Sequence, residues 1–166
     1  MNTIVKAGLA TGILCEAWAF LFGFAGWYRS SATMSLFYCV ILIQIAVLVW
    51  GLMGTAREGR SYGGQIAAGT LISLIGGVII FFGAMLFTTV VFKDYFQVTT
   101  ALQEQALRAK GLPEADMRQI MAMAAKGQNP VAQGMAGFIG TVVTGVVLSL
   151  ILGIFIRAKS APVVRA

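Results

Sequence analysis

Four long apolar runs constrain the fold of this chain more than any other feature. Each exceeds the roughly 20 residues that an α-helix needs to cross the hydrocarbon core of a bilayer. Backbone polar groups in lipid must be satisfied within a helix or a closed barrel, and the apolar/polar alternation of barrel strands is absent. The sequence therefore predicts four membrane-spanning helices, over residues 4–28, 34–54, 64–92 and 131–156.

The composition points in the same direction. Of the 166 residues, 58% are hydrophobic and only 11% are charged, whereas a soluble domain carries about 25% charged residues. The length allows one domain, over residues 1–166. The net charge of +6 favours anionic lipid headgroups as partner, because the basic residues flank apolar spans. Without a basic stripe interleaved with aromatic residues, we expect no nucleic-acid binding.

The basic residues also suggest an orientation in the membrane. With the N-terminus inside, six of them fall on each side, but the inner six lie on short segments close to helix ends, where the positive-inside bias acts most strongly. We expect a multi-pass protein of the bacterial inner (cytoplasmic) membrane with both termini in the cytoplasm. The inner six are Lys6, Arg57, Arg60, Arg157, Lys159 and Arg165.

One sizeable polar stretch, residues 93–130, separates the third apolar run from the fourth. Gly111 and Pro113 are typical of a helix end followed by a helix start. Beyond them, apolar residues recur at helical spacing, which indicates a helix with one apolar face. The predicted fold class is therefore all-α: an integral membrane four-helix bundle with an amphipathic helical hairpin between helices 3 and 4. The apolar face consists of Met117, Ile120, Met121 and Ala124.

Glu16 is the one charged residue in the middle of an apolar run. A charge is costly there, and intramembrane acids are candidates for function. No basic residue shares its depth, so we expect the neutral acid. Three interpretations remain open: a structural acid hydrogen-bonded to Gln44 or a backbone carbonyl, a proton-coupled site, or a contact to a partner subunit. Residues at similar depth form a predicted intramembrane polar cluster of Glu16, Gln44, Thr141 and Thr144.

Small residues recur every fourth position on the predicted fourth helix. Such ridges allow close approach of helix backbones in lipid, where no hydrophobic effect drives association. Packing within the chain is one interpretation, and contact with a second copy or another membrane protein is the other. The predicted helix-packing ridge consists of Gly137, Thr141, Gly145, Ser149 and Gly153.

The sequence offers no recognisable catalytic or metal-binding pattern. It contains no histidine, which removes the commonest general base and metal ligand. Cys15 and Cys39 both fall in apolar runs and are typical of small buried hydrophobic residues. No nucleophile triad, phosphate-binding loop or zinc-ligand spacing is present. We expect no enzymatic activity, no metal and no cofactor.

Several short motifs mark the ends of the predicted helices: Glu58-Gly59-Arg60-Ser61-Tyr62-Gly63-Gly64-Gln65 with Ala68-Gly69, Phe92-Lys93-Asp94-Tyr95-Phe96, Lys110-Gly111-Leu112-Pro113-Glu114 and Asn129-Pro130. Together they resemble one membrane protein family, domain of unknown function 4199. The likeness covers nearly the whole chain, although Lys93 stands where the family usually has proline. It implies four membrane helices with a long loop between the third and fourth, and it implies no activity.

Two functions are compatible with these observations. The first is a non-enzymatic accessory or interaction subunit that binds a partner, or a second copy, through helix 4 or the 93–130 hairpin. The second is a small proton-coupled transporter centred on Glu16 and Gln44. A transporter requires a water-reachable cavity in the middle of the helices, whereas an accessory bundle should be dry there.

Overall fold

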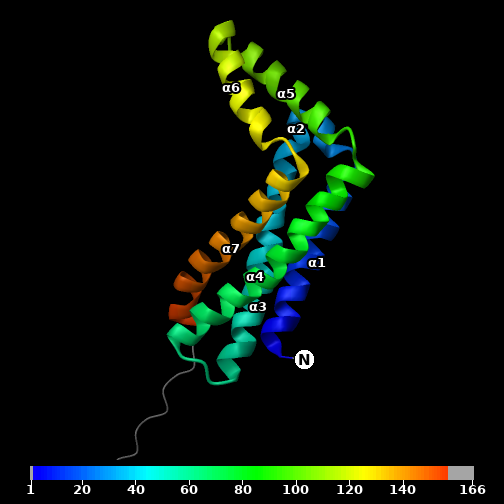
Figure 1. Ribbon diagram of the computed structural model, residues 1–166. Coiled ribbons are helices and arrows are strands. Elements are labelled where there is room, and N and C mark those ends of the chain that lie inside the picture. The colour runs from blue at the N-terminus through cyan, green and yellow to red at the C-terminus, as the bar shows by residue number, and fades with distance from the viewer. Residues whose placement is uncertain (1, 157–166) are drawn as a thin grey trace, which may run out of the picture.

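The computed structural model describes residues 2–156, and every regular element in that range is a helix. Four helical stretches are long and apolar enough to cross a membrane, and they run alongside one another (Figure 1). The basic cluster of Arg157, Lys159 and Arg165 lies outside the described residues. The four stretches are Thr3–Phe24, Ser31–Arg57, Tyr62–Val91 and Pro130–Phe155.

The first helix, α1 (Thr3–Phe24), ends before the predicted boundary at residue 28. Gly26 adopts a left-handed conformation with φ of 70°, which glycine tolerates without steric cost and which ends the helix. Trp27 and Tyr28 consequently belong to a short 3-10 turn, η1 (Trp27–Arg29). The aromatic residues expected to close the first span therefore lie just beyond it.

The second and third stretches are longer and less regular than predicted. The second consists of α2 (Ser31–Met34), the 3-10 turn η2 (Ser35–Tyr38) and α3 (Cys39–Arg57). The third consists of α4 (Tyr62–Leu86) and a π-helical turn, η3 (Phe87–Val91). π-Helical turns are rare and occur frequently at functional sites.

Helix α4 lies between α1 and α7 (Pro130–Phe155), and glycines on all three helices allow the close approach. A Cβ at Gly8 would lie 2.6 Å from the Cβ of Ile75. On the opposite side of α4, a Cβ at Gly145 would overlap the hydroxyl of Ser73. The contacts are therefore of the small-residue type expected for helices in lipid.

Aliphatic residues fill the space between the helices at the end nearest the N-terminus. They come from α1, α3 and α4, and Leu148 and Leu152 of α7 pack against them. In lipid, where no hydrophobic effect drives helix association, close van der Waals packing stabilises such a cluster. The buried cluster consists of Ile4, Ala7, Leu48, Leu52, Ala68 and Ile72.

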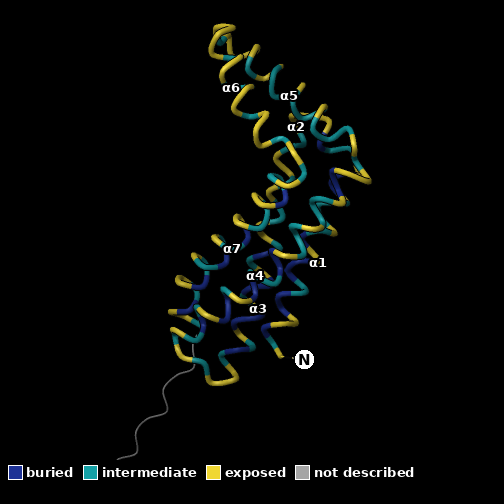
Figure 2. The backbone as a smooth tube through the Cα atoms, in the orientation of Figure 1, coloured by how far each residue is buried: buried dark blue, intermediate teal, exposed yellow. Residues whose placement is uncertain are grey.

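Large apolar side chains also cover the outside of the four long helices. Figure 2 shows exposed positions along their outer sides, and Phe24, Leu42 and Phe155 are 72%, 66% and 78% exposed. Exposed apolar surface on this scale is rare on monomeric soluble proteins and is typical of surfaces that contact lipid or another protein. The structure is therefore compatible with a membrane protein.

Two shorter helices, α5 (Tyr95–Ala109) and α6 (Glu114–Gly127), extend beyond one end of the four long ones (Figure 1). Gly111 between them has a φ of 69°, as expected for a helix-ending glycine. The Thr100 hydroxyl of α5 donates a hydrogen bond of 2.6 Å to the side-chain oxygen of Gln128, just after α6. This bond ties the two helices together near the start of α7.

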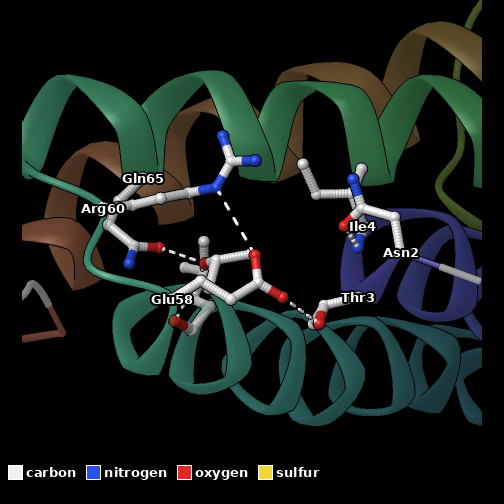
Figure 3. A network of polar contacts seen from close by, with 8 residues as sticks. Asn2, Thr3, Ile4, Glu58, Arg60 and Gln65 are labelled. Atoms are coloured by element: carbon white, nitrogen blue, oxygen red, sulfur yellow. Dashed lines mark hydrogen bonds and ion pairs between the residues drawn. The ribbon is translucent and has the colours of Figure 1, made fainter.

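Polar contacts fasten the opposite end, where the chain begins (Figure 3). The hydroxyl of Thr3 donates to the carboxylate of Glu58, and Arg60 lies 3.8 Å from the other oxygen of that carboxylate. Deeper in the same region, Thr55 donates to the side-chain oxygen of Gln65 over 2.7 Å. The turn between α3 and α4 is thereby tied to the start of α1.

Candidate functional site

The structure brings two of the four predicted cluster residues together. Gln44 of α3 is 6% exposed, and its side-chain nitrogen donates to the backbone oxygen of Thr141 in α7 over 2.8 Å. Thr144 is half-buried on α7 and takes part in none of the described side-chain hydrogen bonds. This hydrogen bond links α3 to α7.

Glu16 forms no described hydrogen bond to Gln44, which was one of the alternatives that the sequence left open. Its carboxyl group, in the second half of α1, faces Gly83 of α4 so closely that a Cβ at Gly83 would overlap it. One carboxyl oxygen, Oε2, is buried and has no hydrogen-bond partner within residues 2–156. The side-chain nitrogen of Gln44 instead donates to α7.

A cavity of about 70 Å³ adjoins the Glu16 side chain. A water molecule occupies roughly 30 Å³ in the liquid, so the space holds about two. The cavity is partly open and is lined by residues from α1, η2, α4, η3, α5 and α7. Its polar lining is Glu16, Thr88, Tyr95 and Gln133, and its aromatic lining is Phe22, Phe37, Phe87 and Tyr95.

Small residues and the π-helical turn create this space. Gly83 leaves room for the carboxyl group, while Ala84 and Gly137 line the cavity without filling it. Phe87 and Thr88 reach the cavity from the π-helical turn η3, whose wider winding displaces side chains from the regular α-helical positions. The local helix distortion thus contributes directly to the site.

The surroundings of the Glu16 carboxyl group determine which of its charge states is stable. Burial of a polar group without a hydrogen bond costs roughly 1–3 kcal/mol, and burial of an unpaired charge costs far more. No Lys or Arg lines the cavity. The group is therefore stable either as the neutral acid or as the carboxylate beside a cation that enters from outside.

A cluster of aromatic and charged residues lies at the α5 end of the cavity. The Tyr28 hydroxyl donates to Asp94 over 3.0 Å, and Arg29 pairs with the same carboxylate at 2.5 Å. Burial, followed by the hydrogen bond to Asp94, raises the pKa of Tyr28. Tyr95, whose ring centroid lies 5.6 Å from that of Tyr28, has its pKa raised by burial. Both phenols therefore remain neutral over the physiological range.

The predicted helix-packing ridge on α7 faces α4 of the same chain. Four of its residues, Thr141, Gly145, Ser149 and Gly153, are buried, while Gly137 is half-buried at the cavity. A Cβ at Gly69 of α4 would overlap the Ser149 hydroxyl. The ridge is therefore occupied by packing within the chain.

The remaining candidates offer little chemistry. Within residues 2–156 no three His, Cys, Asp or Glu residues lie close enough to hold a metal ion. Cys15 is buried and Cys39 half-buried, and both are free thiols. Thr88, Tyr95 and Gln133 were not predicted as site residues, although a glutamine near the start of an apolar helix, as at Gln133, is an unusual polar position that could have indicated one of them.

These features define a class of protein: an all-helical chain with four apolar helices, as in multi-pass membrane proteins. The chain belongs to the family described as protein of unknown function (DUF4199), whose model matches residues 6–158. This confirms the resemblance noted in the sequence. Searches of curated proteins and of solved structures give no match.

Proposed function

We propose that this protein is a single integral membrane domain over residues 1–166, built as a four-helix bundle with an amphipathic α5–α6 hairpin outside the lipid. The lengths of the four apolar helices and their exposed apolar side chains support the bundle. The hairpin interpretation is supported by its composition. Met117, Ile120 and Met121 are half-buried, whereas most of the other α6 positions are exposed.

We propose further that the protein is a non-enzymatic, proton-coupled transporter in which Glu16 binds the proton. The observation that carries this proposal is the Glu16 side chain, which lines a partly open cavity while its Oε2, buried against Gly83, has no hydrogen-bond partner among the described residues. A proton-carrying acid needs both features, because the proton must arrive and leave, and because no fixed partner holds the carboxylate in one state. An accessory bundle without transport has no need of a cavity at this position.

Gln44 was expected to share the proton-coupled site with Glu16, but in this mechanism its role is structural. Its bond to the Thr141 backbone oxygen fixes α3 against α7. The polar groups that share the cavity with Glu16 are Tyr95, Thr88 and Gln133. The Thr88 hydroxyl already donates to the Ala84 backbone oxygen over 2.9 Å, and the amide of Gln133 does not readily pass on a proton, so the phenol of Tyr95 is the better proton relay.

The second candidate function is an accessory subunit of a membrane complex or a homo-oligomer. The position of α5 and α6 beyond the four long helices favours it, because this pair is accessible to a partner (Figure 1). The α7 ridge supports it less, since α4 covers that ridge. A partner would therefore bind through the hairpin.

We propose an inner-membrane location with both termini in the cytoplasm. The N-terminus and the end of α7 lie at the same end of the molecule, opposite α5 and α6 (Figure 1). In a background without the native thiols Cys15 and Cys39, a Gln105→Cys variant should react with a membrane-impermeant thiol reagent added outside, because Gln105 is exposed on α5. Labelling only from the cytoplasmic side would reverse the orientation.

Infrared difference spectroscopy tests the proton-binding role of Glu16. Purified protein in lipid is stepped from about pH 5 to about pH 9, and the neutral-carboxyl band is compared with that of Glu16→Gln. We expect a band that disappears within this window in the wild type and is missing from the variant. The glutamine keeps the size and hydrogen-bonding capacity of the side chain, so the fold should survive.

Two other outcomes contradict the proposal. A carboxyl band that persists from pH 5 to pH 9 identifies Glu16 as a structural acid, and this result would favour the accessory function over transport. A group already ionised at pH 5 means that a fixed cation or bulk water reaches it.

A proton-flux assay in liposomes tests transport itself. Proton flux should be lost in Glu16→Gln at unchanged protein yield.

A further inference from the structure

We propose that the Glu16 cavity binds a small primary ammonium ion, of one or two carbon atoms, which enters as the Glu16 proton leaves. This inference rests on the proposed proton-binding role of Glu16. The observations that carry it are the cavity's size, its acceptors and its aromatic walls. Each restricts the chemistry of the ligand in a different way.

The charge of the ligand follows from the balance inside the cavity. Glu16 is the one ionisable acid in the lining, and no Lys or Arg lines it. When the proton leaves, the carboxylate is uncompensated at a site where an unpaired charge is strongly disfavoured. A monovalent cation restores neutrality, whereas an anion or a divalent ion would not. The neutral acid plus an ammonium ion becomes a carboxylate–ammonium pair plus a released proton.

The polar lining distinguishes an ammonium group from a metal ion. A primary ammonium presents three N–H donors and no acceptor. Four side chains that carry oxygen line the cavity: Glu16, Thr88, Tyr95 and Gln133. They provide enough acceptors for all three donors. Hard metal cations prefer about six oxygen ligands, which is more than these groups provide.

The aromatic lining favours an organic cation. Phe22, Phe37, Phe87 and Tyr95 all line the cavity, and the rings of Phe22 and Phe37 pack edge to face with centroids 5.5 Å apart. Cations are attracted to aromatic faces, most strongly where water is excluded. The same walls accept the short alkyl part of the ligand, which a bare metal ion lacks.

The cavity volume limits the size of the ligand. A space of about 70 Å³ holds about two water molecules. Methylammonium and ethylammonium have two and three non-hydrogen atoms and fit this space. Tetraethylammonium has nine non-hydrogen atoms and does not fit, although it carries the same charge. Size therefore gives a prediction that is independent of charge.

The test uses the full-length protein in lipid nanodiscs, in weak buffer containing a pH-indicator dye. Methylammonium or ethylammonium chloride should release protons and reduce the Glu16 carboxyl band, and both signals should be absent in Glu16→Gln. Ethanol, the neutral counterpart of ethylammonium, should have no effect. Because ion and proton compete for one group, the apparent affinity should fall about tenfold for each pH unit below the Glu16 titration midpoint.

A second variant checks the aromatic contribution without altering the acid. Phe37→Leu should weaken ethylammonium binding roughly two- to thirty-fold, the range for loss of a cation–π contact. Phe82→Leu is the matched control, since Phe82 is 64% exposed and does not line the cavity. Equal binding by both variants would contradict the aromatic assignment.

The outcomes separate this inference from the proposed function. A carboxyl band that titrates with pH but ignores ethylammonium overturns the ammonium site and leaves the proton-binding role intact. A band that does not titrate overturns both. Sodium chloride acting as strongly as ethylammonium would identify a metal-ion site instead. Tetraethylammonium acting as strongly would show that the ligand lies outside the cavity.

Discussion

The two halves of the four long helices are filled in different ways. Near the N-terminus, aliphatic residues such as Leu48 and Ile72 are completely buried, and glycines pack against serines between α4 and α7. Near α5, the helices are separated by aromatic rings, a π-helical turn and the Glu16 cavity. The first half is closed, and the second contains an acid whose buried oxygen has no partner in the described chain.

This difference separates stability from function. A closed half of small residues holds the helices at fixed distances, because dense packing transmits strain and resists deformation. An unpartnered buried carboxyl group lowers stability and leaves the group free to bind a proton or a ligand. We expect substitutions in the closed half to affect folding, and substitutions around the cavity to affect proton and ligand binding.

The largest effect should come from Gly145→Leu in the closed half. Even the Cβ would overlap the Ser73 hydroxyl of α4, and overpacking of this kind costs about 1–3 kcal/mol or more. Thermal unfolding in mild detergent measures the loss. Gly140→Leu is the matched control, because a Cβ at Gly140 meets nothing within 4 Å. Equal stability of the two variants would show that α7 does not pack on α4 in this register.

A smaller difference in stability should appear between two glycine-to-alanine variants, one in each half of the four long helices. Gly69→Ala should be destabilised by about 1–3 kcal/mol, because its Cβ meets the short Ser149 side chain, which is held by a 2.6 Å hydrogen bond to the Gly145 backbone oxygen. Gly83→Ala meets the flexible end of Glu16. Its stability should stay within about 1 kcal/mol of wild type, since helix propensity offsets the displacement.

Infrared titration of Glu16 should reverse the order of the two variants, with the larger effect in Gly83→Ala and the smaller one in Gly69→Ala. Gly83→Ala should shift the Glu16 titration midpoint, because it moves the carboxyl group relative to the cavity, whereas Gly69→Ala should leave the midpoint unchanged. If Gly69→Ala shifts it and Gly83→Ala does not, the two halves are not independent.

Much of the fold could be predicted from the sequence because its causes are local. Apolar runs identified four long helices, and Gly111 marked the end of α5. The predicted end of the first span failed because Gly26 interrupts a run that stays apolar through Trp27, and hydropathy alone does not register backbone conformation. The π-helical turn likewise leaves the composition of the third run unchanged.

The site was predicted less completely, because it depends on which side chains meet. Glu16 stood out by its charge alone, but its pairing with Gln44 was inferred from similar depth. Helix rotation decides such pairings, and it directs Gln44 toward α7 and Glu16 toward α4. Tyr95 reaches the cavity from outside the four apolar runs, so no analysis of those runs alone could include it.

The smallest expected effect concerns the contact that closes the cavity end of the molecule. Tyr28→Phe removes the hydrogen bond to Asp94 and keeps the ring packing against Phe92 and Tyr95. The loss should be about 1 kcal/mol at neutral pH, below the roughly 1.5–3 kcal/mol of a bond to a charged group, because Asp94 is partly exposed and stays paired with Arg29. Tyr38→Phe serves as the control, because Tyr38 is 67% exposed and forms none of the described side-chain hydrogen bonds.

Alkaline pH sharpens this last comparison. Burial raises the pKa of Tyr28 above its ordinary value of 10.0, so the folded protein retains a proton that the unfolded chain loses at about pH 10. The stability from this group is complete below pH 10 and is lost as pH rises from there toward the folded-state pKa. Unfolding measured at pH 8 and at pH 11 should therefore show a smaller alkaline loss in Tyr28→Phe than in wild type. An identical alkaline loss in both proteins would mean that folding does not raise the pKa of Tyr28 and that its hydrogen bond to Asp94 does not retain the proton.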